Sequence, residues 1–173
     1  MANWNINNDT IQSNQYMLYV AEIPTTGDPQ YKVLGYGKSN GLNLSQDTSE
    51  ASSKFSCAWK ANQATRIGYQ VTADSLYCTN ETDASSFDTL VAMMVKQENI
   101  AWALGQAAPH IGTDGAALPC DTNPFTLDTT KDYYNGIGLI TSLDLNAEED
   151  SVVSCSLTLD GSGEILKNGQ PIQ

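Results

Sequence analysis

Positive charge is what this sequence has least of. Lys and Arg number only 8, against 20 Asp and Glu, so the chain of 173 residues carries a formal net charge of −12. The cations are scattered, with no run that would build a basic patch. Affinity for nucleic acid comes from Lys and Arg that displace counterions from phosphates. Tight phosphate binding is therefore not expected, and the acidity favours either solubility or a surface that repels a polyanion.

Histidine, a common catalytic base and metal ligand, is almost missing as well. His110 is the single imidazole, and it stands in a Gly-, Ala- and Pro-rich stretch without a nucleophile signature. The glycines at 35, 37 and 41 lack the following helix and Lys-Ser/Thr ending of a phosphate-binding loop. Glu148-Glu149-Asp150 would suit acid–base work or calcium, but they fall in a predicted turn, where a solvated role is expected. We predict no enzyme activity, no metal and no cofactor.

Cysteine pairs and apolar targeting segments are not evident either. The four cysteines, at 57, 78, 120 and 155, include no Cys-x-x-Cys pair. The first ten residues hold no basic stretch followed by an apolar run, so we predict no secretory signal, which also disfavours a fimbrial subunit. Reduced, packed thiols are then expected, with a Cys57–Cys78 bridge as the alternative. No apolar run approaches a membrane span.

Small polar residues take the place of the missing charge. Charged residues make up 16% of the chain, while Asn, Ser, Thr, Gln and Gly are abundant. These residues suit turns and strand surfaces better than helices, and the composition predicts one mainly β domain. Strands are predicted near 15–21, 31–36, 42–45, 66–77 and 99–104.

Two stretches alternate long enough to predict sheets with one wet face. Between 66 and 77, every second residue from Ile67 to Ala73 is apolar, and the positions between them are polar. From 133 to 160, two such runs flank the acidic turn and predict an antiparallel hairpin, although Ile140 breaks the polarity of its side. In this hairpin Ile137, Leu139, Leu143 and Leu145 are expected to share the apolar face.

One helix is predicted, over 86–97. Ser85 and Asp88 form a capping-box pattern at its start, and its apolar face is expected to hold Phe87, Leu90, Val91 and Met94. The segment 46–64 is predicted to be a long loop that contacts a partner, because it is polar but contains Phe55 and Trp59. The predicted divisions of the chain are a flexible N-terminal arm (1–15), the β domain (16–166), a Pro-rich insertion within it (106–131) and a polar tail (167–173).

Several short motifs follow one another in a distinctive order. They are Gly41-Leu42-Asn43-Leu44-Ser45, the acidic stretch 81–86 before the helix, Tyr133-Tyr134-Asn135-Gly136, Ile140-Thr141-Ser142-Leu143 and Ser156-Leu157-Thr158-Leu159-Asp160-Gly161-Ser162-Gly163. Each alone is ordinary strand sequence, but their order over about residues 33–166 resembles the major tail tube protein of long-tailed, non-contractile phages (the siphophage major tail protein). The first 36 residues and the insertion depart from the family pattern.

The resemblance implies a β-sandwich or partial barrel with one flanking α-helix, whose strands join a shared hexameric β-barrel tube. A barrel of about two dozen strands would be roughly 45–50 Å across its backbone. Phe55 and Trp59 become candidates for contact between rings. The polar strand faces, with Arg66 as their only cation, become candidates for the lumen; the residues are Gln70, Thr72, Asp74, Ser142, Asp144, Ser154, Ser156, Thr158 and Asp160.

The implied function is a structural subunit of a virion tail, assembled in the host cytoplasm. Its rings would stack into a tube whose acidic or neutral lumen conducts DNA from capsid to host. The implied partners are further copies of the chain, tail terminator and tail tip or baseplate proteins, and, transiently in the lumen, the tape measure protein and DNA; no membrane is implied. Two alternatives stay open: the inner tube of a contractile tail or injection system, and a carbohydrate-binding β-sandwich with Trp4, Trp59 and Trp102 on one platform.

Overall fold

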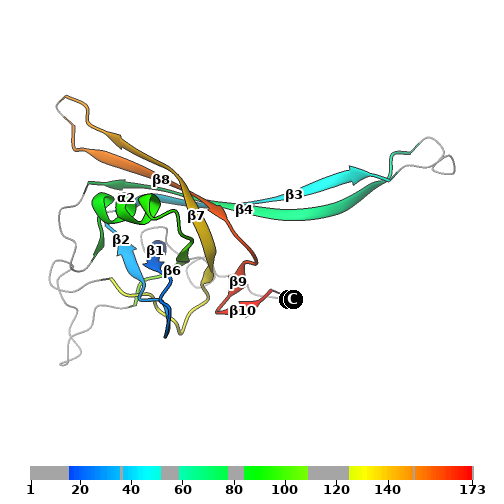
Figure 1. Cartoon of the computed structure of the whole chain (residues 1–173), viewed down its shortest axis with the longest axis horizontal. Coiled ribbons are helices and arrows are strands. Elements are labelled where there is room, and N and C mark those ends of the chain that lie inside the picture. The colour runs from blue at the N-terminus through cyan, green and yellow to red at the C-terminus, as the bar shows by residue number, and fades with distance from the viewer. Residues whose placement is uncertain are drawn as a thin grey trace, which may run out of the picture.

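A computed structural model describes residues 16–35, 37–51, 59–77, 84–108, 125–149 and 151–172. They form a mainly β structure with one helix, as predicted (Figure 1). In chain order the elements are β1 (Tyr16–Glu22), β2 (Lys32–Leu34), β3 (Gly37–Glu50), β4 (Asn62–Leu76), β5 (Ala84–Ser85), α2 (Phe87–Val95), β6 (Ile100–Gln106), β7 (Tyr134–Asn146), β8 (Ser154–Gly161), β9 (Leu166–Lys167) and β10 (Gln170–Pro171).

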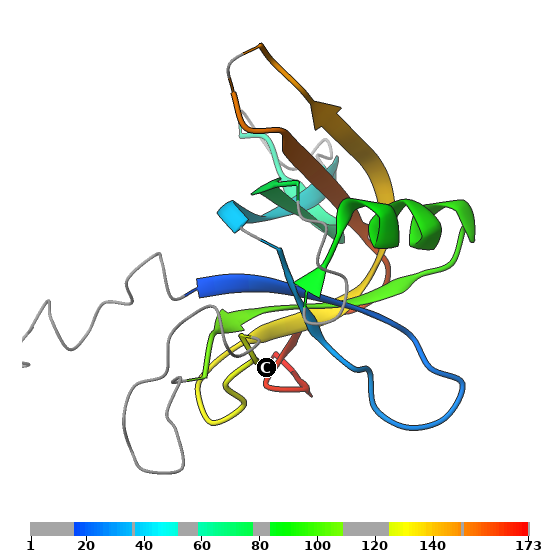
Figure 2. The same ribbon diagram turned by 90° about the vertical axis from the view of Figure 1, so that its left-hand side faces the viewer.

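The main strands follow the order β3-β4-β8-β7-β6-β1-β2-β5 in one sheet that folds over on itself. The corner is made by β7, which pairs with β6 from Tyr134 to Gly138 and with β8 from Gly138 to Asn146. The strands β3, β4, β8 and β7 form one layer, and β6, β1 and β2 lie across its lower side, with α2 beside them (Figures 1 and 2). This is the expected partial barrel with a flanking helix.

A β-bulge in β7 decides which of its side chains reach the core. The register with β8 shifts between Ile140 and Ser142, which inserts one extra residue. Before the bulge Ile137 and Leu139 are 41% and 39% exposed while Ile140 is buried; after it Ser142 returns to the open face. The prediction of one apolar face with Ile137, Leu139, Leu143 and Leu145 was therefore wrong, and the apolar Ile140 that broke the alternation marks the bulge.

The core lies between the two layers. Trp102 of β6 is fully buried near its centre, with its ring centroid 5.5 Å from that of Tyr69 on β4. Both layers and α2 supply the other side chains of this cluster, among them Leu18, Val20, Val71, Leu90, Met93 and Leu159. Burial of each large apolar side chain stabilises the fold by about 1.5–3 kcal/mol, so this cluster holds the two layers together.

Helix α2 and its N-cap each start one residue later than predicted. The N-cap is Ser86, whose Oγ accepts a hydrogen bond from the backbone N–H of Thr89 at 3.2 Å. The buried helical side chains are Leu90 and Met93. Two members of the predicted apolar face, Val91 and Met94, are each 37% exposed.

The strands β3 and β4 form an arm that leaves the body (Figure 1). We call residues 44–68 the arm; every described residue in it is exposed. The predicted loop 46–64 is shorter than expected, because ladder pairing continues to Glu50 and Asn62. Whether a residue joins a β-ladder depends on the presence of a partner strand beside it. Polar residues whose composition suits a loop can therefore still extend the ladder between β3 and β4. Residues 52–58 lie outside the described part of the chain.

Two segments predicted at the periphery pack on the body. Phe125 and Leu127, within the predicted insertion 106–131, contact a second apolar cluster around Tyr19. The predicted tail 167–173 contributes to a hairpin, β9–β10, and β9 pairs with β7. The predicted N-terminal arm 1–15 and the middle of the insertion, 109–124, lie outside the described residues.

Candidate assembly surfaces

The nine residues predicted to face a lumen lie together on one face of the four-stranded layer. Directly paired residues of antiparallel strands point to the same side of a sheet. The ladders join Asp144, Ser156 and Asp74 in one row and Ser142, Thr158 and Thr72 in the next, and they pair Asp160 with Gln70 and Ser154 with Asn146. None of the nine is buried. The alternate residues Val71, Ala73, Leu157 and Leu159 are buried beneath them.

Hydrogen bonds tie the carboxylates of this polar face to uncharged neighbours. Ser39 Oγ donates to Asp74 Oδ2 at 2.7 Å, Gln70 Nε2 donates to Asp160 Oδ1 at 2.8 Å, and Ser142 Oγ donates to Asp144 Oδ2 at 2.9 Å. The donors carry no charge, so they orient the carboxylates without neutralising them. The polar face therefore keeps its negative charge.

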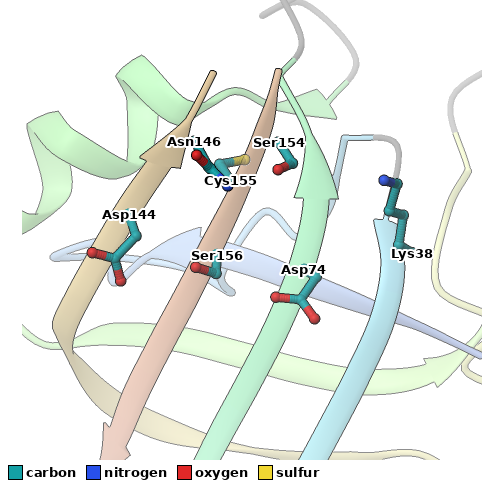
Figure 3. Close-up of a pocket in the computed structure, with 7 residues that line it drawn as sticks. All are labelled: Lys38, Asp74, Asp144, Asn146, Ser154, Cys155 and Ser156. Carbon is teal, nitrogen blue, oxygen red and sulfur yellow. The ribbon is translucent and has the colours of Figure 1, made fainter. Parts of the chain in front are cut away.

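Strand β3 adds residues to the polar face that the sequence prediction missed. Ser39 and Asn43 pair with Asp74 and Gln70 and widen the face by one strand. Lys38 lines an open hollow of about 370 Å³ together with carboxylates and hydroxyls of the other three strands (Figure 3). The cation expected near this face was Arg66 alone. The prediction confined this strand to 42–45, which left Lys38 out.

Both edges of the four-stranded layer are open. Among the described strands, β3 pairs only with β4, and β7 pairs only with β8 from Leu139 to Asn146. The backbone N–H and C=O groups of an open edge are a template for pairing with another chain, and monomeric proteins cover or shorten such edges. With 14 residues, β3 is a long edge. The layer is therefore suited to continue into the sheet of another molecule.

The arm exposes apolar side chains, and two of them, Leu44 and Ile67, lie on the side opposite the polar face. Leu44 and Ile67 are 53% and 66% exposed, and Trp59 near the far end is 84% exposed. Leu44 pairs with the buried Tyr69, so both side chains lie on the same side of the sheet. Within the body, the second layer covers this side. The other predicted ring contact, Phe55, lies outside the described residues.

An exposed ion pair holds the C-terminal hairpin to the loop before β7. Lys167 Nζ lies 2.7 Å from Asp132 Oδ2, and Asn168 Nδ2 donates to Asp132 Oδ1 at 2.9 Å. Donation by Lys167 and Asn168 lowers the pKa of Asp132, and the same contact with Asp132 raises the pKa of Lys167. These shifts arise from a structural clamp.

The described residues bear on the other hypotheses too. Trp102 is fully buried, so it cannot share an exposed sugar-binding platform with Trp59; Trp4 lies outside the described residues. Nowhere in the described ranges do three His, Cys, Asp or Glu side chains gather as a metal site. Cys155 is free and buried, while His110 and the other cysteines are not described. Within the same ranges, no helix has the length and apolar character to cross a membrane.

Comparison with known proteins gives matches in structure alone. No protein-family model matches the chain, and no curated protein is significantly similar to it in sequence. A chain of the SPP1 tail tube superposes with a TM-score of 0.63 at 12% identity, covering 94% of this chain and 81% of the other. This chain has the fold of a phage tail tube protein.

Two further structures extend the comparison. A chain in the tail of an empty gene transfer agent particle with C6 symmetry has a TM-score of 0.60 at 12% identity, covering 91% of this chain and 98% of the other. A chain in the baseplate of the anti-feeding prophage has a TM-score of 0.56 at 7% identity, covering 91% and 95%. The resemblance predicted from the order of motifs is thus confirmed as a likeness of fold.

Proposed function

We propose that this chain is the repeating subunit of a phage-type tail tube, in which hexameric rings stack into a conduit for DNA. The observation that carries the proposal is a four-stranded layer with two open edges and one predominantly polar face, on which Leu139 is an exposed apolar side chain. Its strands alternate in direction, so β3 and β7 run antiparallel to each other. The β7 edge of one copy can therefore accept β3 of the next in a regular ladder, and a closed ring leaves no edge.

The size of such a ring suits its cargo. Hexameric rings, which match the C6 symmetry of the gene transfer agent tail, give a barrel of about two dozen strands that is roughly 45–50 Å across its backbone. Side chains then leave room for duplex DNA. The second layer and α2 cover the apolar face of the sheet, so the polar face is the one that lines the lumen.

The chemistry of the polar face suits the passage of a polyanion. We assign the lumen to Gln70, Thr72, Asp74, Ser142, Asp144, Ser154, Ser156, Thr158 and Asp160. Their carboxylates repel phosphates, and their hydroxyls and amide offer only weak contacts. With so few cations, DNA makes few long-lived contacts with the wall. The tape measure protein would occupy the same lumen before DNA does.

The arm, residues 44–68, makes the contacts that stack one ring on the next. It extends beyond the body (Figure 1) and carries Trp59, whose large exposed ring is of the kind that supplies much of the energy at interfaces. Phe55 is proposed as its companion. The ends of the stack would meet tail terminator and tail tip or baseplate proteins, and the whole would lie in the virion tail after assembly in the host cytoplasm. In this role the chain is not an enzyme.

Electron microscopy of the purified protein tests the proposal. At high protein concentration, negative-stain images are expected to show rings or hollow rods of uniform bore. A monomer that persists under these conditions, by imaging and sedimentation, would sink the proposal.

A second candidate is the inner tube of a contractile tail or injection device. The similarity to a chain of the anti-feeding prophage baseplate favours it as an alternative. The two candidates differ in whether the outside of the tube binds a sheath. Co-expression with a sheath protein encoded beside this chain separates them, because only an inner tube is expected to become coated.

A further inference from the structure

The two ends of the four-stranded layer carry matching apolar surfaces. The arm leaves one end, and the β7–β8 turn closes the opposite end (Figure 1). We call residues 144–152 the tip. Leu145 and Val152 at the tip are 49% and 66% exposed, comparable with Leu44 and Ile67 on the arm at 53% and 66%.

The arm and tip leucines face the same side of the sheet. Leu44 pairs with the buried Tyr69, and Leu145 pairs with the buried Cys155, so both point away from the polar face. In copies stacked end to end with their polar faces inward, both leucines would lie on the outer side of the shared barrel. They can therefore meet without disturbing the lumen.

The charges of the two ends are complementary. The tip sequence holds Asp144, Glu148, Glu149 and Asp150 and no Lys, Arg or His. The arm holds three of the eight cations, Lys54, Lys60 and Arg66, against two carboxylates, in a chain whose net charge is −12. Lys60 pairs with Glu50 along the arm at 3.4 Å. Arg66 has no ion-pair partner among the described residues and is free to pair outside the molecule.

We propose that the tip of each subunit receives the arm of a copy in the adjoining ring, with Leu44 and Ile67 against Leu145 and Val152. Arg66 precedes Ile67 in the strand and so lies on the polar side of the arm, where it would stand beside the tip carboxylates, of which Asp144 lies on the polar face. This inference rests on the proposed tube function and names the surface that the arm binds. Opposite charges at the two ends favour head-to-tail stacking over head-to-head stacking, because like ends repel.

Charge reversal with rescue tests the contact. Arg66→Glu and the pair Glu148→Lys/Glu149→Lys are each expected to yield rings that stack poorly, and the variant combining all three changes is expected to stack again. An exposed ion pair changes association by about two-fold, and with six contacts per ring interface the loss compounds to roughly 60-fold. The measurements are the ratio of rings to tubes by electron microscopy and sedimentation, and the salt concentration that separates rings.

Matched controls exclude an effect of net charge. Lys131→Glu changes the net charge as Arg66→Glu does but lies off the arm and tip, and it should stack normally. Arg66→Glu combined with Glu98→Lys and Glu164→Lys has the net charge of the rescued variant and should stay unstacked. Normal stacking of Arg66→Glu, or equal rescue by the off-site lysines, overturns this inference and leaves the tube function standing. A wild-type protein that forms neither rings nor tubes overturns both.

Discussion

At the scale of single residues, the core depends on glycines that make room for aromatic rings. A Cβ placed on Gly161 would lie 2.4 Å from the ring of Tyr69, and one on Gly136 would lie 2.7 Å from the Tyr69 hydroxyl. That hydroxyl donates a hydrogen bond to the backbone carbonyl of Ile137 at 2.6 Å. Tyr69 therefore links β4 to β7 at the point where β7 turns between the layers.

Gly161→Ala is expected to lower the free energy of unfolding by about 1–3 kcal/mol, because the added methyl group overpacks the site against a ring held by Trp102. Chemical denaturation measures the change. Gly37→Ala is the control, since its nearest contact would be an ordinary 3.8 Å, and it should shift stability far less. Equal effects from both variants would contradict the packing argument.

The clamp between Asp132 and Lys167 makes a prediction about titration. Lys167→Met removes the largest cause of the lowered Asp132 pKa, so that pKa should rise toward its ordinary value of 3.8, in part only because Asn168 still donates. Since the folded pKa of Asp132 is depressed, its stabilising contribution is present above the unfolded pKa and is lost as pH falls through the folded pKa. Carboxyl NMR titration measures the shift, and an unchanged pKa would show that the clamp does not form.

At the scale of elements, the arm is separable from the body. Gln46 and Ile67 are directly paired across it, so the chain can be closed there by a two-residue turn. Everything removed by that closure is exposed where it is described. The arm is therefore expected to contribute little to the stability of an isolated subunit.

Replacement of residues 47–66 by Asn-Gly is expected to leave the circular dichroism spectrum β-rich and the melting temperature nearly unchanged, while tubes give way to single rings. Thermal melting and electron microscopy measure the two effects. If this variant still forms long tubes, the arm does not make the contact that stacks the rings. A collapse of the melting temperature would mean that the arm also supports the body.

The elements show where prediction from sequence succeeded and failed. The long strand, the hairpin and the helix were predicted from alternation and capping, since these patterns are local. The bulge at Ile140 and the length of the arm were missed, because both are set by register with a partner strand. The pairing of the polar tail was missed for the same reason, because its partner strand, β7, lies about thirty residues earlier in the chain.

At the scale of the whole molecule, the proposed lumen should be sensitive to added positive charge. Thr72 lies on the polar face and is not engaged in the core. In a hexameric tube, Thr72→Lys would place a girdle of lysines around the channel, and each cation that meets a phosphate strengthens DNA binding in a salt-dependent way.

Tubes of Thr72→Lys are expected to retain short linear duplexes at low salt and to release them at high salt, whereas wild-type tubes retain none. Circular DNA has no end that can enter the lumen. Its retention therefore reports binding to the outer surface of the tube alone. Thr72→Gln is the neutral control of similar size. Retention of circles as strongly as linear fragments would place this face on the outside of the tube and overturn the lumen assignment.

The sequence by itself determined the alternation of β4 and β8 with their polar and apolar sides, the helix α2 and the cation-poor character of the polar face. Those properties depend on neighbours a few positions apart and on composition. Only the tertiary structure decided which polar residues of β3, β4, β8 and β7 stand in common rows, which edges stay open, and how far the arm projects. Register and edge exposure depend on contacts between segments distant in the chain, and a local pattern of residues does not encode them.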